Sequence, residues 1–167
     1  MTILDQLADY ARERTKQAQQ SVPLAVIRRQ AEEAAGQRIR AADQGFIFEK
    51  ALRKPDLTFI CECKKASPSK GLIAPEFPYL QIAREYEAAG ADCISVLTEP
   101  KWFLGSDDYL REIAQEVSIP CLRKDFTVDE YMIYEAKVLG ASAVLLICSI
   151  LEREELRAYR ELCDELG

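Results

Sequence analysis

The spacing of apolar residues changes about one third of the way along the chain. Up to about residue 55, apolar residues recur every three to four positions within charged segments, which is the period of an amphipathic helix. Beyond that point, short unbroken apolar runs alternate with longer stretches of helical period. The pattern predicts a helical extension over residues 1–55 and a second domain, over residues 56–167, in which strands and helices alternate.

The predicted extension contains three apolar patches, at residues 3–11, 24–34 and 46–52. The second patch follows Pro23, and proline is favoured near the start of a helix. We therefore expect helices that pack their apolar sides against the rest of the protein.

The second domain repeats a strand–helix unit four times. The predicted strands are residues 58–64, 93–97, 120–124 and 143–147, and the predicted helices are residues 77–89, 107–117, 128–139 and 152–166. Successive strands start about 23–35 residues apart, which is the length of one βα unit. Four such units in a row predict a parallel sheet with right-handed crossovers.

Boundary residues support these helices. Gly90 and Gly140 each follow a predicted helix, where glycine commonly ends helices. Thr127 and Glu130 have the spacing of a capping box, which predicts that the third helix of this domain starts at that point.

Two architectures accommodate four βα units: an open doubly wound sheet and part of a (βα)8 barrel. The central strands of an open sheet are apolar on both faces. Here Glu62 and Lys64 share one face of the first strand, because side chains alternate along a strand, and Lys124 ends the third strand. Charges at the carboxyl ends of alternate strands favour the mouth of a barrel. No G-x-G-x-x-G or Walker motif supports a nucleotide-binding sheet.

Composition limits the chemistry. The net charge of −6 argues against nonspecific binding to nucleic acid. The absence of histidine removes the commonest general base and metal ligand, and we expect no metal and no cofactor. The six cysteines form no C-x-x-C pair and predict reduced thiols in a cytoplasmic protein. The first residues lack the pattern of a signal peptide, and no apolar run of about 18 residues predicts a membrane span.

Several motifs occur in the order found in the indole-3-glycerol phosphate synthase family, and the whole chain resembles the N-terminal part of that family. The motifs are the helical extension, Glu62-x-Lys64-x-x-Ser67-Pro68-Ser69 with Gly71, Leu97-Thr98-Glu99 with Phe103-x-Gly105-Ser106, Arg123-Lys124-Asp125-Phe126, and Ala143-Val144-Leu145-Leu146-Ile147. The resemblance implies a lyase of tryptophan biosynthesis. This lyase closes the ring of 1-(2-carboxyphenylamino)-1-deoxyribulose 5-phosphate and releases carbon dioxide and water.

The resemblance also assigns roles to seven residues. It implies that Lys124 is the general acid at the substrate carbonyl, that Lys64 contacts anionic groups of the substrate, and that Glu62 orients a lysine or transfers a proton. The implied substrate contacts are Ser67, Phe103, Phe126 and Leu145. Ordinary structural roles compete with these assignments: a Glu62–Lys64 ion pair, a turn-forming hydroxyl at Ser67, and core packing of Phe103 and Phe126.

The length of the chain sets a further expectation. A (βα)8 barrel needs roughly 200–250 residues, whereas this sequence holds the extension and four units. We therefore expect half of a barrel, inactive alone because the family's second catalytic glutamate and phosphate loops lie on later strands. The alternatives are a non-catalytic half-barrel that self-associates or pairs with a complementary half, and a relative of phosphoribosylanthranilate isomerase, which normally lacks the extension.

Overall fold

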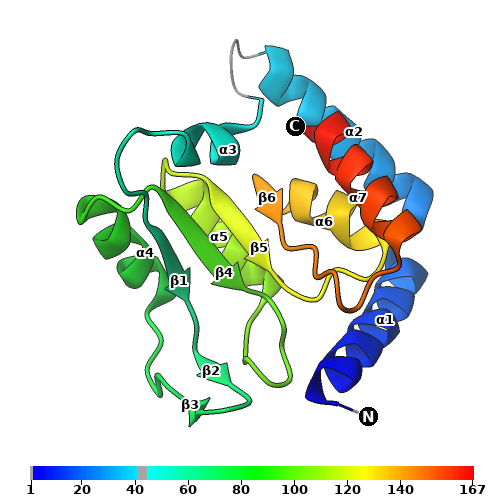
Figure 1. Ribbon diagram of the computed structural model, residues 1–167, viewed down its shortest axis with the longest axis horizontal. Coiled ribbons are helices and arrows are strands. Elements are labelled where there is room, and N and C mark those ends of the chain that lie inside the picture. Colours follow the sequence, from blue (N-terminus) through cyan, green and yellow to red (C-terminus); the bar gives the residue numbers. More distant parts are fainter. Residues whose placement is uncertain (1, 41–44) are drawn as a thin grey trace. The chain divides into compact units, whose positions relative to one another are not determined.

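The computed structural model describes residues 2–40 and 45–167 (Figure 1). Contacts within the chain define two compact units. The first, here called the helical unit, comprises Met1–Gly45, Phe126–Val138 and Val144–Gly167. The second, here called the sheet unit, comprises Phe46–Asp125 and Leu139–Ala143. Each unit is described by itself, and a domain boundary near residue 55 stays a prediction.

The helical unit is built from four helices. They are α1 (Ile3–Ser21), α2 (Leu24–Arg40), α6 (Glu130–Val138) and α7 (Arg153–Leu166). Ile27, Ala31 and Ala35 of α2 form a buried cluster with Tyr131 and Tyr134 of α6. The small alanines let the two helices approach closely at this contact. The first two predicted apolar patches of the extension are therefore confirmed as helices that bury their apolar sides. The third patch also forms a helix, Ile47–Leu52, but that helix buries none of its residues.

The ends of the helices depend on specific side chains. Thr2 and Asp5 form a capping box at the start of α1. The capping box predicted at Thr127 is wrong, because α6 begins only at Glu130, and Asp129 Oδ1 accepts a hydrogen bond from the amide of Tyr131 at 2.8 Å. A carboxylate one residue before the helix thus accepts a hydrogen bond from an amide of its first turn, as a residue that caps a helix does.

The sheet unit contains the parallel sheet. Its elements are α3 (Ile47–Leu52), β1 (Ile60–Cys63), β2 (Ala66–Ser67), β3 (Gly71–Leu72), α4 (Tyr79–Ala88), β4 (Cys93–Leu97), α5 (Asp107–Glu116), β5 (Cys121–Lys124) and the start of β6 (Ala143–Val144). The strands follow the order β1-β4-β5-β6, and β1 and β5 both pair with β4 in parallel. This is the predicted α/β fold with four parallel strands, although β6 is shorter than expected.

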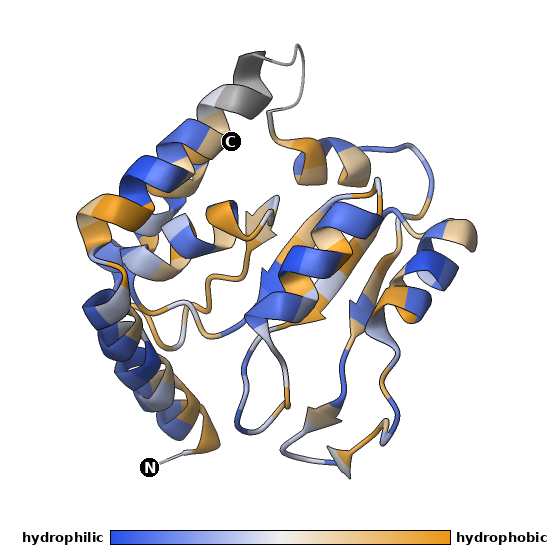
Figure 2. Cartoon of the chain, turned by 180° about the vertical axis from the view of Figure 1, so that it is seen from behind, coloured by the Kyte–Doolittle hydropathy of each residue, from blue (hydrophilic) through white to orange (hydrophobic). Residues whose placement is uncertain are grey.

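Helices α4 and α5 pack against the sheet, and each combines hydrophobic and hydrophilic residues (Figure 2). Leu110 and Ile113 of α5 are fully buried there, and every residue of β4 is buried. The strongly amphipathic pattern of α5 follows from this position between the sheet and solvent.

The two glycines predicted to end helices adopt the left-handed conformation, with φ of 92° at Gly90 and 96° at Gly140. The amide of Ala91 donates to the carbonyl of Tyr86 at 3.0 Å, which closes the end of α4. A side chain at either position would strain the turn that leads the chain from helix into strand. None of the described helices has the length and apolar character needed to cross a membrane.

Candidate active site

The register of the sheet decides which side chains share a face. Glu62 lies opposite Ser95, and Leu97 lies opposite Lys124. Laterally paired residues of parallel strands point to the same side, and alternate residues along each strand do so too. Glu62, Lys64 and Lys124 therefore project from one face of the sheet, as the alternation along the first strand predicted.

These three side chains meet in an ion-paired group, here called the Glu62 triad. Lys64 Nζ donates to Glu62 Oε1 at 2.7 Å, and Lys124 Nζ donates to Glu62 Oε2 at 3.0 Å. The side chain of Glu62 is 28% exposed and those of both lysines are 34% exposed. The triad is thus reachable by a ligand, and its two cations exceed its one anion.

The small side chain of Ser95 makes this meeting possible. Strand β4 lies between β1 and β5, and Ser95 stands on β4 directly beside Glu62. Its hydroxyl donates to Glu62 Oε2 at 3.4 Å. A larger residue there would separate Glu62 from Lys124. Sequence reasoning missed Ser95, although it is the one polar residue within the apolar run of residues 93–97.

The triad also sets the ionisation of Glu62. Partial burial acts to raise the pKa of Glu62, but hydrogen bonds from Lys64 and Lys124 outweigh it and hold that pKa below its ordinary value. Glu62 is therefore a carboxylate at neutral pH, which orients both ammonium groups through charge-assisted hydrogen bonds.

Ser67 lies on β2 in the loop after β1. Its hydroxyl accepts a hydrogen bond from the amide of Lys70 at 3.2 Å and lies 3.5 Å from the hydroxyl of Ser69. These contacts favour the turn-forming role, and the role in substrate binding stays a prediction.

Phe103 lies in the loop after β4 and is half-buried. Its carbonyl accepts a hydrogen bond from the amide of Ala66 at 3.2 Å, which joins this loop to the one that carries Ser67. The structure thus brings two of the predicted substrate contacts onto loops that touch each other.

Comparison with known proteins matches the whole of this arrangement to one family. The family model described as indole-3-glycerol phosphate synthase covers residues 4–167. The chain belongs to the indole-3-glycerol phosphate synthase family. Among curated members, the protein of Ruminiclostridium cellulolyticum is 50% identical over 99% of this chain and 61% of its own length. That of Lachnoclostridium phytofermentans is 48% identical over 99% of this chain and 63% of its own length.

A third indole-3-glycerol phosphate synthase, from Lacticaseibacillus paracasei, is 59% identical over 72% of this chain and 46% of its own length. The chain thus spans about three fifths of the length of the first two relatives and less of the third. The comparison establishes the family of this chain.

The other two contacts implied by the family resemblance, Phe126 and Leu145, belong to the helical unit. Phe126 packs against a buried cluster that includes Ala8 and Ala11 of α1 and Met132 of α6. This contact supports the core-packing reading of Phe126. Leu145 is half-buried. For both residues, contact with a substrate ring stays a prediction.

The motif of this family that contains Lys124 also places charges on the opposite face of β5. Arg123 is 2% exposed and donates to Asp107 Oδ1 at 2.8 Å and to Thr98 Oγ1 at 3.2 Å. Thr98 Oγ1 in turn donates to Asp125 Oδ2 at 2.6 Å. This group, here called the Arg123 network, supports a structural role for Arg123 and Asp125.

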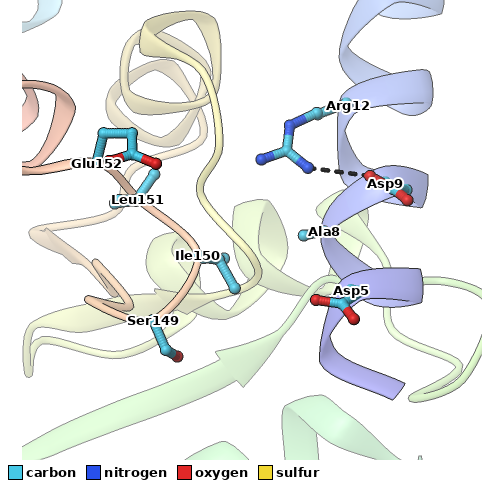
Figure 3. A pocket seen from close by; sticks show the side chains of 8 residues that line it. All are labelled: Asp5, Ala8, Asp9, Arg12, Ser149, Ile150, Leu151 and Glu152. Carbon is cyan, nitrogen blue, oxygen red and sulfur yellow. Dashed lines mark hydrogen bonds and ion pairs between the residues drawn. The ribbon is translucent and has the colours of Figure 1, made fainter. Parts of the chain in front are cut away.

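A cavity of about 250 Å³ in the helical unit contains none of the predicted site residues (Figure 3). It is lined by Asp5, Ala8, Asp9 and Arg12 of α1 and by residues 149–152. Arg12 and Asp9 pair at 3.1 Å, as the dashed line in Figure 3 marks. The charged groups on its α1 wall therefore largely satisfy one another.

Proposed function

We propose that this chain supplies the Glu62 triad to the indole-3-glycerol phosphate synthase reaction in the cytoplasm. The observation that carries the proposal is the pair of lysines on one carboxylate at the carboxyl ends of parallel strands. Active sites of (βα)8 barrels lie at that end of the strands. The family membership agrees with it.

In the proposed reaction, the ring carbon that bears the substrate's carboxylate bonds to the ketone carbon. The ketone oxygen takes a proton from Lys124 and becomes a hydroxyl. Carbon dioxide then leaves, and the electrons of its bond restore the aromatic ring. Finally the hydroxyl takes a proton and departs as water, while the neighbouring carbon, which is bonded to nitrogen, loses a proton and the double bond of the indole forms. We assign these two proton transfers to Lys64 and Glu62. A proton donor in the correct position contributes typically 10²–10⁴-fold to such a step.

Electrostatics also favours this substrate. The substrate carries a carboxylate and a phosphate, whereas the protein carries a net charge of −6. Binding therefore needs a local excess of positive charge. The Glu62 triad supplies it, because Lys64 and Lys124 share a single carboxylate partner.

The binding test uses a substrate analogue whose ketone is reduced to an alcohol, so that the ring cannot close. We expect Lys124→Met and Lys64→Met each to weaken its binding at least about 10-fold, which corresponds to ~1.4 kcal/mol. Lys16→Met is the matched control, because it removes the same charge from an exposed position on α1. Unchanged affinity in both site variants would contradict the proposal, as would an equal loss in the control.

We further propose that the 167-residue polypeptide is inactive by itself, or many orders of magnitude slower than a longer relative. By resemblance, a second glutamate and the phosphate loops come from strands beyond β6. Fluorescence of indole-glycerol phosphate measures the product. A turnover near the median enzyme rate of ~10 s⁻¹ for this polypeptide would contradict the proposed inactivity.

A property of the edge of the sheet favours association of the isolated polypeptide with itself or with a complementary half-barrel. Within the described residues, β1 pairs with β4 alone, and Leu57, Phe59 and Ile60 beside it are exposed. An exposed apolar edge strand is a ready template for pairing with another chain. We expect dimers or larger species by light scattering at micromolar concentration, and a stable folded monomer would contradict this expectation.

A further inference from the structure

Glu99 is a fully buried carboxylate in the sheet unit, with 0% exposure, and it lies directly after β4. A buried charge requires strong compensation. Glu99 obtains it from three successive backbone amides, because Oε1 accepts from Lys101 at 2.9 Å, and Oε2 accepts from Trp102 at 2.8 Å and from Phe103 at 2.9 Å. Hydrogen bonds to an ionised acceptor are roughly twice as strong as neutral ones.

The loop around this carboxylate is held at its far end as well. The amide of Gly105 donates to the carbonyl of Glu99 at 2.8 Å. A Cβ at Gly105 would lie 2.4 Å from the carbonyl oxygen of Leu97, so the loop passes too close to β4 to admit a side chain there. Leu104 adopts a left-handed conformation with φ of 51°, which is costly for a leucine. The contacts to Glu99 and β4 together impose this conformation.

The loop then contacts the neighbouring one. The amide of Phe103 donates a hydrogen bond to Glu99. The carbonyl of Phe103 accepts a hydrogen bond from the amide of Ala66 at 3.2 Å. Ala66 immediately precedes Ser67 on β2. A continuous chain of hydrogen bonds thus runs from Glu99 through Phe103 to the loop that carries Ser67.

We propose that Glu99 is a positioning residue that sets Phe103 and, through it, the Ala66–Ser67 strand beside the Glu62 triad. Glu99 itself touches no substrate. What these loops bind rests on the proposed function, whereas the mechanical link between them does not. A carboxylate that merely stabilised its own loop would act on residues 101–103 and leave Ala66 unaffected.

The test compares Glu99→Gln with Glu87→Gln in the 167-residue protein. Glutamine keeps the size of the side chain but removes one acceptor oxygen and the negative charge. The loss of charge weakens the hydrogen bonds from Trp102 and Phe103 even where the remaining oxygen still accepts them. Glu87 is the matched control, because its carboxylate also binds a backbone amide, that of Ser118 at 2.7 Å, from α4. Amide hydrogen exchange measured by NMR reports each loop, and the amide of Ile94, bonded to Pro120, reports the sheet.

In Glu99→Gln we expect exchange at least about 10-fold faster at Trp102, at Phe103 and also at Ala66, with Ile94 changed no more than in the control. Exchange at Ala66 that stays at the wild-type rate would overturn the proposal, as would unchanged exchange at Trp102 and Phe103. If Glu99→Gln does not fold, the same measurements are made on Glu99→Asp. Its side chain keeps the negative charge but is one methylene shorter, so the carboxylate lies farther from the three amides.

Equilibrium dialysis with anthranilate separates this proposal from the proposed function. We expect anthranilate to bind the wild type, with affinity at least about 5-fold weaker in Glu99→Gln and unchanged in Glu87→Gln, equivalent to ~1 kcal/mol for the former. A wild type that does not bind anthranilate would count against the proposed function, while the exchange at Ala66 would still decide the role of Glu99.

Discussion

Strand β5 carries one cation on each face, and the two cations lie in very different surroundings. Arg123 is 2% exposed and is held by Thr98 and Asp107, whereas the side chain of Lys124 is 34% exposed and is held by Glu62. Adjacent residues of one strand thus belong to two separate charge groups, the Arg123 network and the Glu62 triad.

The comparison shows why both groups are charged. The Arg123 network lies beside α5, where it joins the start of that helix to β4 and β5. Its buried members, Thr98, Arg123 and Asp125, depend on protein partners, whereas Asp107 is 39% exposed. The Glu62 triad projects from the opposite face of the sheet and stays partly exposed to solvent. The charges on one face link α5 to the strands. Those on the other face remain partly exposed, as the proposed binding of a ligand requires.

The largest effect on stability is expected from Arg123→Met. It removes the buried guanidinium that binds Asp107 and Thr98. Breaking a buried pair costs about 3–5 kcal/mol, and we expect a loss of ~3 kcal/mol because the side chain of Asp107 is 39% exposed. Urea unfolding followed by circular dichroism measures the loss. Arg111→Met, which removes an exposed ion pair on α5, serves as control and should change stability by under ~0.5 kcal/mol. Equal losses of stability in the two variants would contradict a special role for the buried Arg123.

A smaller effect is expected from Thr98→Val, which preserves shape but removes the hydroxyl between Arg123 and Asp125. Leaving buried partners unsatisfied costs about 1–3 kcal/mol. The control is Thr15→Val, because the buried hydroxyl of Thr15 bonds only to the carbonyl of Ala11 in its own helix. Thermal or urea unfolding should show a clearly larger loss of stability in Thr98→Val than in Thr15→Val. Similar losses would contradict a role for the Thr98 hydroxyl in linking Arg123 to Asp125.

On the other face, Lys124→Met should change the free energy of unfolding by less than ~1 kcal/mol, as is usual for partly exposed ion pairs. Glu62 keeps Lys64 as a partner in this variant. Urea unfolding beside Arg123→Met makes the comparison direct. A loss as large as that of the arginine variant would mean that the Glu62 triad is a structural network like its neighbour.

The smallest effect is a pH dependence from Glu62. Because its folded pKa lies below the ordinary value of 4.5, the carboxylate stabilises the fold above that pH, and this contribution is lost as pH falls through the folded pKa. Glu62→Gln should therefore be less stable than wild type near neutrality, by under ~1 kcal/mol, as is usual for a partly exposed ion pair. The difference should vanish at the lowest pH at which both proteins fold, whereas a constant difference would contradict this origin.

The sequence predicts those features that depend on period or composition. Alternation along residues 58–64 places Glu62 and Lys64 together, and the repeat predicts the four strands and the helices between them. Helix-ending glycines at 90 and 140 are recognisable because the left-handed turn favours that residue.

Features that depend on register or on backbone contacts are beyond such reasoning. Ser95 matters only because β4 lies between β1 and β5, and the order of strands is not written in any one of them. Glu99 is one acidic residue among many until its three amide partners are known. Phe126 shows the same limit, because the family resemblance implies a binding role while the structure shows packing against a buried cluster, and the binding role stays a prediction.

The six reduced cysteines can report local opening of the fold. Cys148 is exposed and Cys61 and Cys163 are half-buried, whereas Cys63, Cys93 and Cys121 lie buried in the sheet. Burial raises the pKa of Cys63 to about 12 and that of Cys93 to about 11, so these thiols resist alkylation until their strands separate. The order in which an alkylating reagent modifies the thiols will therefore report which parts of the chain open first and how often.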